Sequence, residues 1–271
     1  MKTVVIGLGT VGRALATLLR RKHEVHVRDM VPALAEPVDV VNICFPYSEE
    51  FENAVVGYVG EYRPRATIIH STVPVGATRR VAGGCSKEIE FVHSPVNGLH
   101  HEMLHSLVEF PKMLGGLGRG LDGLALEFLR ESGFACVPFP SAEDTELAKL
   151  LCTLRYGLDI AFEKQVKHLC QELGTDDRFV YREWTDRYNE GYERLHHHEF
   201  RRPLMRYVPG PIGGTCVIPN ARLLMASHYF APAEQLLEFN AALEEKEAKP
   251  YGNRQDAREL AAPQASSPGR D

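Results

Sequence analysis

Three glycines near the N-terminus have a spacing that suits binding of the phosphates of a nucleotide. Gly7, Gly9 and Gly12 follow a short apolar run and precede a segment of helical composition. In this context the first glycine allows a tight turn, the second lets the backbone approach a pyrophosphate, and the third permits close helix–strand packing. The expected phosphate-binding residues are Gly7, Leu8, Gly9, Thr10, Val11 and Gly12. The alternative is a structural strand–turn–helix without a ligand.

A carboxylate further along indicates which dinucleotide would bind. Asp29 ends the next apolar run, 20 residues after Gly9. At that position a carboxylate accepts hydrogen bonds from the adenosine ribose and repels a 2′-phosphate, so the sequence favours NAD over NADP. Arg28 stands directly before it and weakens this preference.

A run of histidines suggests a metal site, but its spacing argues against one. His196, His197, His198 and Glu199 are consecutive. Consecutive residues on one element point in different directions, whereas ligands on one helix are normally three or four residues apart. We expect no metal here and interpret the run as polar surface or as part of a substrate cleft.

The elements that must position these residues alternate between strand and helix over the first 140 residues. Short apolar runs rich in Val and Ile are typical of strands covered on both faces. The expected strands are 3–6, 24–28, 38–44, 66–70, 90–93 and 112–114, with helices between them that include 11–22, 49–62 and 120–132. This alternation predicts an α/β fold, a doubly wound parallel sheet of Rossmann type, as an NAD-binding domain over 1–140.

From Ser141 the pattern becomes helical. Ser141 is a plausible N-cap, no proline follows before Leu173, and Gly174 is a normal C-terminal stop. The sequence therefore predicts one long helix that opens an all-α domain over 141–247. The segment 248–271, rich in Ala, Pro and Ser, is predicted to be a disordered tail.

Composition narrows the class of protein. The 271 residues carry a net charge of −5, without the basic excess of a nucleic-acid or anionic-membrane binder. No apolar run approaches the roughly 18 residues of a membrane span, and the N-terminus becomes glycine-rich too early for a secretion signal. Six cysteines without a Cys-x-x-Cys pair suggest reduced thiols. We expect a cytoplasmic protein with a small-molecule substrate.

Several segments resemble, in order, the motifs of the UDP-glucose/GDP-mannose dehydrogenase family. Ser71-Thr72-Val73-Pro74-Val75-Gly76 is similar to the family's S-T-V-P-V-G-T, and Pro209–Asn220 is similar to its cysteine loop, P-G-x-G-x-G-G-x-C. Weaker similarities lie at 39–46, 112–116 and 142–150. The similarities cover roughly residues 1–230.

The resemblance implies a reaction and the residues for it. The family oxidises a primary alcohol to a carboxylate in two NAD-dependent steps, through a thiohemiacetal and a thioester on a cysteine that Cys216 matches. Lys149 matches the family's catalytic lysine, whose ammonium assists at the reacting oxygen. The further implied site residues are Phe45, Pro46, Ser71 and Thr72 beside the cofactor, Asn97, His100, Gly213 and Gly214 beside the substrate, and Thr72, Thr153 and Asn220 in catalysis. A homodimer through the long helix is also expected.

For both reactive residues a structural alternative stays open. A free thiol is commonly a buried core residue, and without the loop match that would be the preferred interpretation of Cys216. A lysine on a helix is commonly solvated, although the apolar neighbours of Lys149 make a buried one credible. The other cysteines are interpreted as core or incidental residues.

Four departures from the family pattern bear on the details. Thr153 stands where the family has asparagine, and Asn220 where it has an acidic residue. The loop Ser94-Pro95-Val96-Asn97 lacks the family's carboxylate after the proline, for which His100 is one possible replacement. Only 51 residues follow Asn220, too few for the family's third domain, so the sequence predicts the reaction class better than the substrate.

Three functions remain to be separated. The leading hypothesis is an NAD-dependent oxidation of a primary alcohol, of sugar type, to a carboxylate. A single-step dehydrogenase of the hydroxyacid type would need Lys149 but not Cys216, and would form one NADH per substrate rather than two. An inactive regulatory or scaffold protein would bind NAD without forming NADH.

Overall fold

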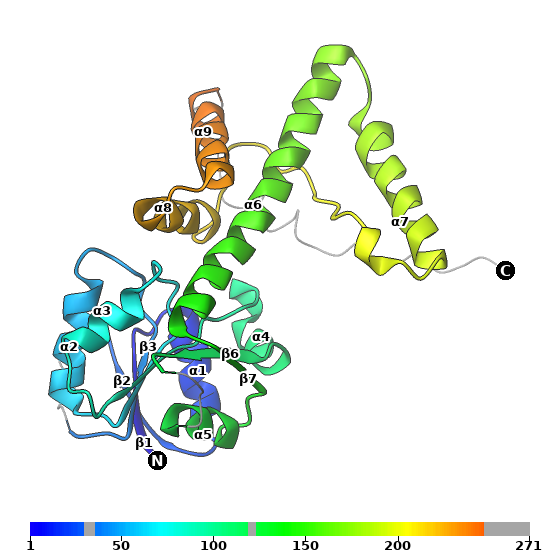
Figure 1. Cartoon of the computed structure of the whole chain (residues 1–271). Helices are drawn as coiled ribbons and strands as arrows, with labels where there is room; N and C mark the ends of the chain where they lie inside the picture. Colours follow the sequence, from blue (N-terminus) through cyan, green and yellow to red (C-terminus); the bar gives the residue numbers. More distant parts are fainter. Residues whose placement is uncertain (30–35, 119–122, 247–271) are drawn as a thin grey trace.

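The computed structural model describes residues 1–29, 36–118 and 123–246, and Figure 1 shows their arrangement. The predicted tail at 248–271 and the last residue of the predicted helical domain lie outside the described residues. Within the described residues a sheet and its covering helices occupy the first part of the chain, and helices alone follow from Ala142 onward.

Seven strands in the described residues form one sheet in the order β2-β1-β3-β4-β5-β6-β7. The strands are β1 (Lys2–Ile6), β2 (Glu24–Arg28), β3 (Val40–Ile43), β4 (Ala66–Ile69), β5 (Glu90–His93), β6 (Lys112–Gly116) and β7 (Cys136–Phe139). Strand order reverses at β1, which is the topology of a doubly wound sheet. The predicted α/β fold class is therefore confirmed.

Two details of the predicted sheet are wrong. Strand β6 runs antiparallel to β5, with His93 opposite Gly115, so the sheet is mostly rather than wholly parallel. Strand β7 was not predicted, because two of its four residues are exposed and it contains Pro138, which is typical of an edge strand. Because β6 is reversed, its first residue, Lys112, lies at the carboxyl edge of β5.

Helices cover both faces of the sheet, and this explains the continuous apolar strands. One apolar layer packs helices α1, α4 and α5 on the sheet, with Leu15, Leu107 and Phe128 at its centre. The other packs α2 and α3 around Phe51 and Val81. The bounds are α1 (Thr10–Leu19), α2 (Phe51–Tyr62), α3 (Ala77–Gly83), α4 (Met103–Glu109), α5 (Leu124–Glu131) and, before α4, the short 3-10 helix η1 (His100–Glu102).

The long helix predicted after Ser141 is present as α6 (Ala142–Leu173). The Ser141 hydroxyl accepts a hydrogen bond from the Asp144 amide at 3.2 Å, and Gly174 ends the helix in the left-handed region at φ 64°. The helix runs from the sheet into the helical part of the molecule (Figure 1). No helix in the described ranges is both long and apolar enough to cross a membrane.

Gly157, near the middle of α6, allows two other helices to cross it closely. A Cβ there would lie 2.5 Å from a methyl carbon of Val217 and 2.8 Å from one of Leu236. The crossing helices are α8 (Val217–Ser227) and α9 (Ala231–Lys246). Together with α6 they bury an apolar cluster that includes Leu150 and Leu154.

The rest of the helical part lies along the distal half of α6. It consists of a π-helical turn η2 (Arg178–Glu183), α7 (Trp184–Arg194) and a 3-10 turn η3 (His198–Phe200). In Figure 1 the chain reverses at the end of α6 that is far from the sheet, and α7 then diverges from α6.

Candidate functional site

The glycine turn between β1 and α1 has the geometry that dinucleotide binding requires. Gly7 has φ +93°, and a Cβ on it would lie 2.7 Å from the Phe45 amide nitrogen. A Cβ on Gly12 would lie 1.8 Å from the Gly7 carbonyl oxygen, which is impossible for any larger residue. A Cβ on Gly9 would meet nothing within 4 Å, so open space adjoins the start of α1. The turn therefore fits a pyrophosphate on the amides of this helix.

The end of β2 supplies the predicted carboxylate. Asp29 is exposed directly after the strand. The neighbouring Arg28 is directed to Glu61, at 3.2 Å, and lies 5.8 Å from the centre of the Tyr58 ring. Its side chain is only 12% exposed. The guanidinium that, from the sequence, would weaken the preference of Asp29 for NAD is therefore already paired with a carboxylate.

Residues expected beside the cofactor follow β3 and β4 at the carboxyl edge of the sheet. The Ser71 hydroxyl donates a hydrogen bond of 2.6 Å to the Phe45 carbonyl and so links the two loops. Thr72 is half-buried next to it, whereas Pro46 is exposed. Carboxyl ends of parallel strands are where ligands bind in sheets of this type.

Lys149 on α6 lies where this edge meets the helical part of the chain. Its ammonium donates to the Asn97 side-chain oxygen at 3.2 Å. Burial lowers the pKa of Lys149, while the nearby thiols of Cys152 and Cys216 oppose that decrease. The structure thus brings Lys149, Asn97 and Cys216 into one region from three separate parts of the sequence.

Cys216 is half-buried at the start of α8, and its carbonyl accepts a hydrogen bond from the Asn220 amide at 2.9 Å. The preceding glycines, Gly213 and Gly214, are exposed, and Gly214 has φ +88°. A β-carbon at either would have no atom within 4 Å. Open space therefore adjoins both glycines that precede the cysteine.

Two residues that depart from the family pattern contact each other. The Asn220 side-chain nitrogen donates to the Thr153 hydroxyl at 3.2 Å, and this hydroxyl in turn donates to the Lys149 carbonyl at 3.0 Å. Both side chains are buried. The pair is neutral, so it can hold α8 against α6 and orient a water but cannot act as a base at neutral pH.

Two other segments singled out from the sequence lie at the surface. His100 is exposed on η1, and in the described residues no hydrogen bond joins it to Lys149 or Cys216. In the histidine run, His197 contacts Glu199 at 2.9 Å and His198 contacts Glu193 at 3.3 Å, all at the surface. Within the described ranges, no three or more His, Cys, Asp or Glu side chains are grouped so that they could hold a metal ion.

Two buried charged residues beside the site were not predicted from the sequence. Glu146, one helical turn before Lys149, accepts hydrogen bonds from the amides of Gly76 at 2.6 Å and Thr78 at 2.9 Å. Lys112 is 2% exposed at the start of β6. A charged residue placed among apolar neighbours is the only sequence signal for either, because their partners lie far away in the chain.

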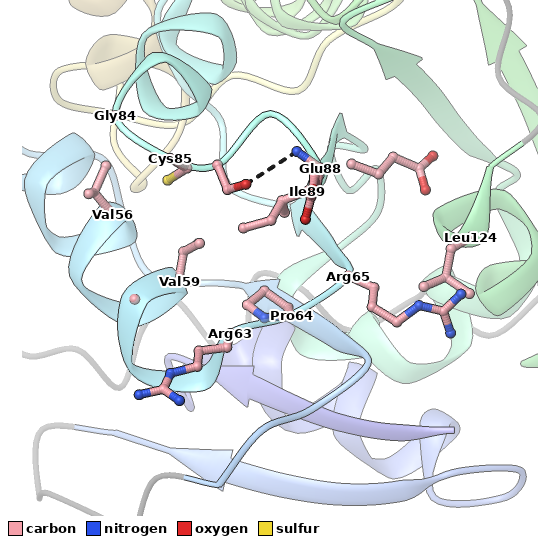
Figure 2. Close-up of a pocket in the computed structure, with 13 residues that line it drawn as sticks. Val56, Val59, Arg63, Pro64, Arg65, Gly84, Cys85, Glu88, Ile89 and Leu124 are labelled. Atoms are coloured by element: carbon pink, nitrogen blue, oxygen red, sulfur yellow. Dashed lines mark hydrogen bonds between the residues drawn. The ribbon is translucent and has the colours of Figure 1, made fainter.

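A cavity of about 820 Å³ lies at the opposite edge of the sheet, before β4 and β5 (Figure 2). Val56, Arg63, Arg65 and Cys85 are among its lining residues, and no predicted site residue is. Figure 2 shows the Arg63 and Arg65 side chains pointing away from each other, so the two do not form a joint anion site.

The fold and the glycine turn define a Rossmann-type protein with a helical part appended through one long helix. No family model matches the chain. It is 22% identical over 162 residues to a UDP-N-acetyl-D-mannosamine dehydrogenase of Methanococcus vannielii, a match that covers 54% of this chain and 38% of the relative. A second one, from Methanococcus maripaludis, is 23% identical over 145 residues, 54% of this chain and 34% of the relative. The chain thus matches well under half the length of these curated relatives.

Solved structures show the same fold. A UDP-D-ManNAc dehydrogenase from Pyrococcus horikoshii has a TM-score of 0.73 at 19% identity, over 92% of this chain and 70% of that one. The 3-hydroxyisobutyrate dehydrogenase of Mycobacterium tuberculosis has a TM-score of 0.66 at 16% identity, over 90% of this chain and 94% of that one. The resemblance to the UDP-glucose/GDP-mannose dehydrogenase family is confirmed by these relatives and neighbours.

Proposed function

We propose that the protein is a nicotinamide-dependent dehydrogenase that oxidises a primary alcohol of a sugar-type substrate to a carboxylate. The observation that carries the proposal is the convergence of Lys149, Asn97 and Cys216 beside the carboxyl edge of a sheet that bears a dinucleotide-type glycine turn. The names of the curated relatives support a nucleotide sugar as the substrate class.

The residues that would hold the cofactor are those of the glycine turn, Asp29, and the loops after β3 and β4. The chemistry that a bound nicotinamide would supply there is acceptance of a hydride from the reacting carbon. Asp29 favours NAD over NADP. Arg28 is the cation nearest to Asp29 in sequence that could pair with the 2′-phosphate of NADP, but it is already paired with Glu61.

Lys149 is proposed to act on the reacting oxygen. Its half-buried ammonium has a pKa lowered by burial, which suits a group that exchanges a proton with an alcohol. The Asn97 side-chain oxygen accepts one hydrogen bond from the Lys149 ammonium. The remaining hydrogens are available to an alkoxide or a carbonyl oxygen of the substrate.

Cys216 is proposed to capture the aldehyde. Its sulfur bonds to the carbonyl carbon while the thiol proton passes to the carbonyl oxygen, giving a thiohemiacetal. The thiohemiacetal becomes the thioester by losing its hydroxyl proton and a second hydride, which the oxidised cofactor would accept. Water then attacks the same carbon, the carbon–sulfur bond breaks, one proton of the water returns to the sulfur, and the carboxylic acid is released. Asn220 and Thr153 can orient this water, although neither can deprotonate it.

The test is the stoichiometry of NADH formed with UDP-N-acetylmannosamine and UDP-glucose as substrates. The wild type is expected to form two NADH per molecule oxidised and to release the acid. Cys216→Ser should stop at the aldehyde oxidation state and lose acid formation. Cys152→Ser is the matched control, because this second thiol also lies near Lys149 but is exposed on α6. Acid formation by Cys216→Ser at the wild-type rate would exclude the thioester route.

A single-step hydroxyacid-type dehydrogenase is the second candidate. The match to 94% of the length of a 3-hydroxyisobutyrate dehydrogenase favours it, as does a neutral Asn220 in place of an acid. It predicts one NADH per 3-hydroxyisobutyrate and no effect of Cys216→Ser. NAD binding by calorimetry with no NADH formed from any of these substrates would favour the third alternative, a regulatory protein.

The proposed assembly is a homodimer through α6, the turn η2 and α7. Large apolar side chains there are exposed in the single chain: Phe162, Leu169, Leu173, Phe179, Val180 and Trp184. A second copy would cover them.

The six cysteines are free thiols, which supports a reducing compartment such as the cytoplasm.

A further inference from the structure

Lys112 is a buried cation that the proposed chemistry does not use. It begins β6, and because that strand is antiparallel to β5, Lys112 lies at the same sheet edge as the candidate site. Its side chain is 2% exposed. Burying an ammonium group costs free energy unless each of its hydrogens has an acceptor. The acceptors around Lys112 therefore indicate the role of this residue.

Three acceptors surround the Lys112 ammonium. It donates to the carbonyl oxygens of Ser94 at 2.7 Å and Pro95 at 3.3 Å, and it lies 3.1 Å from Nδ1 of His70. The other ring nitrogen of His70, Nε2, faces the Asn42 side-chain oxygen at 3.0 Å. Nδ1 also lies 3.0 Å from the Ser94 carbonyl oxygen. A neutral ring carries one proton, and we place it on Nε2, because the Asn42 oxygen has no other donor in the described residues and the Ser94 oxygen already accepts from Lys112. His70 then donates to Asn42, and Nδ1 accepts from Lys112. Three hydrogens thus meet three acceptors.

The two carbonyls belong to the start of the loop that carries Asn97. Ser94 and Pro95 precede Asn97 by three and two residues, and the Asn97 oxygen accepts from Lys149 at 3.2 Å. The other end of the loop is fixed separately. The Leu99 amide donates to the Ser106 hydroxyl at 3.1 Å, so this end rests on α4.

We propose that Lys112 is a positioning residue that holds the loop 94–98 in the conformation in which Asn97 faces Lys149. Its importance for catalysis rests on the proposed function, whereas its hold on the loop does not. The ammonium clamps the near end of the loop as Ser106 fixes the far end. A loop clamped at both ends presents the Asn97 oxygen to Lys149 without an ordering cost on substrate binding.

The charge state of Lys112 sets how many contacts it makes. The titratable groups that face it are Cys44 after β3, His70 after β4, His93 on β5, Cys136 on β7 and Lys149 on α6. Burial lowers the pKa of Lys112 to about 7. Burial also lowers the pKa of His70 well below its usual value, so His70 stays neutral through this range. Above about pH 7 the amine has two hydrogens for three acceptors, so the hold on the two loop carbonyls weakens on average.

The test is amide hydrogen exchange of the full-length protein, followed by mass spectrometry of peptides that contain 94–98. Lys112→Met keeps the length of the side chain and removes its donors. Exchange of these peptides is expected to accelerate by about tenfold relative to the wild type. Lys164→Met is the matched control. Lys164 is also a buried ammonium bound to two carbonyls, those of Val208 at 2.5 Å and Gly210 at 2.6 Å, and its loss should leave 94–98 unchanged. Wild-type exchange rates at 94–98 in Lys112→Met would overturn the proposal.

A second arm uses the wild type alone and so does not depend on how well the variant folds. After correction for the intrinsic rate of exchange, protection of 94–98 should fall between pH 6 and pH 8.5, and this dependence should be absent in Lys112→Met. Constant protection across that range in the wild type would also overturn the proposal. Should the wild type oxidise neither UDP-sugar while its loop behaves as expected, the proposed function fails and the role of Lys112 stands.

Discussion

At the scale of single residues, the site is defined by a lysine with few competing partners. Lys149 has one described side-chain acceptor, Asn97, and two thiols close enough to influence its charge. Burial lowers its pKa, since the charged form loses solvation. A group in this condition can release and accept a proton nearer to neutral pH than an ordinary lysine can.

Removal of this amine should reduce catalysis without reducing cofactor binding. Lys149→Met is expected to lower kcat/KM by about 10²- to 10⁴-fold, the usual contribution of a positioned acid or base. The rise of wild-type activity with pH, as the ammonium of Lys149 deprotonates, should disappear in the variant. Steady-state kinetics with UDP-N-acetylmannosamine between pH 6 and 10 checks both. Lys167→Met, on the same helix but ion-paired with Asp177, should match the wild type, and equal losses in the two variants would contradict this role of Lys149.

At the scale of elements, the first two turns of α6 are joined to the sheet by buried polar contacts. The Thr145 hydroxyl lies 2.8 Å from Nδ1 of His93 on β5. The Glu146 carboxylate accepts hydrogen bonds from the amide of Gly76, which precedes α3, and from the amide of Thr78, in the first turn of α3. Burial raises the pKa of Glu146, and the amide hydrogen bonds oppose that rise because they favour the carboxylate. These contacts determine where Lys149, one turn later, meets the sheet.

Glu146→Gln should therefore destabilise the junction. In this variant one carboxylate oxygen of residue 146 becomes an NH2 group. That group faces the backbone N–H of either Gly76 or Thr78, so one of these two donors loses its acceptor. The expected loss is about 1–3 kcal/mol in the free energy of unfolding, measured by urea denaturation. Glu143→Gln is the control. This carboxylate is also on α6 but pairs with Arg79 near the surface, so its loss should have a much smaller effect. A stability of Glu146→Gln equal to that of Glu143→Gln would show that the buried contacts do not anchor the helix.

At the scale of the whole molecule, the apolar residues of α6 are divided between two environments. Leu150 and Leu154 are buried against α8 and α9, whereas Leu147, Phe162 and Leu169 are exposed. Phe162 and Leu169 belong to the second half of α6, the part of the helix that extends away from the sheet (Figure 1). Several large apolar side chains exposed on one part of a molecule favour an interface there.

An acidic residue on this surface should separate the proposed dimer. Trp184→Asp, at a side chain that is 73% exposed at the start of α7, would bury a charge in the interface and is expected to weaken self-association by tenfold or more. Light scattering after gel filtration over a range of concentrations measures this. Tyr229→Asp changes another exposed aromatic residue, which lies just before α9, and should keep the wild-type mass. A monomeric wild type would exclude the proposed assembly.

Features that depend on neighbours along the chain were predictable from the sequence. The glycine turn, the long helix between Ser141 and Gly174, and most strands follow from φ preferences, capping and apolar runs, which act over a few residues. The similarity of motifs also identified Cys216 and Lys149 as candidates, although it did not show that they converge.

Contacts between distant parts of the chain were decided only by the tertiary structure. The reversed β6, the hydrogen bond between Thr153 and Asn220, and the buried Lys112 each depend on residues dozens of positions apart. The sequence by itself determined an α/β sheet with a nucleotide-type turn and a long helix. The tertiary structure determined which polar groups share buried space, because only packing excludes water and decides which charges must find partners.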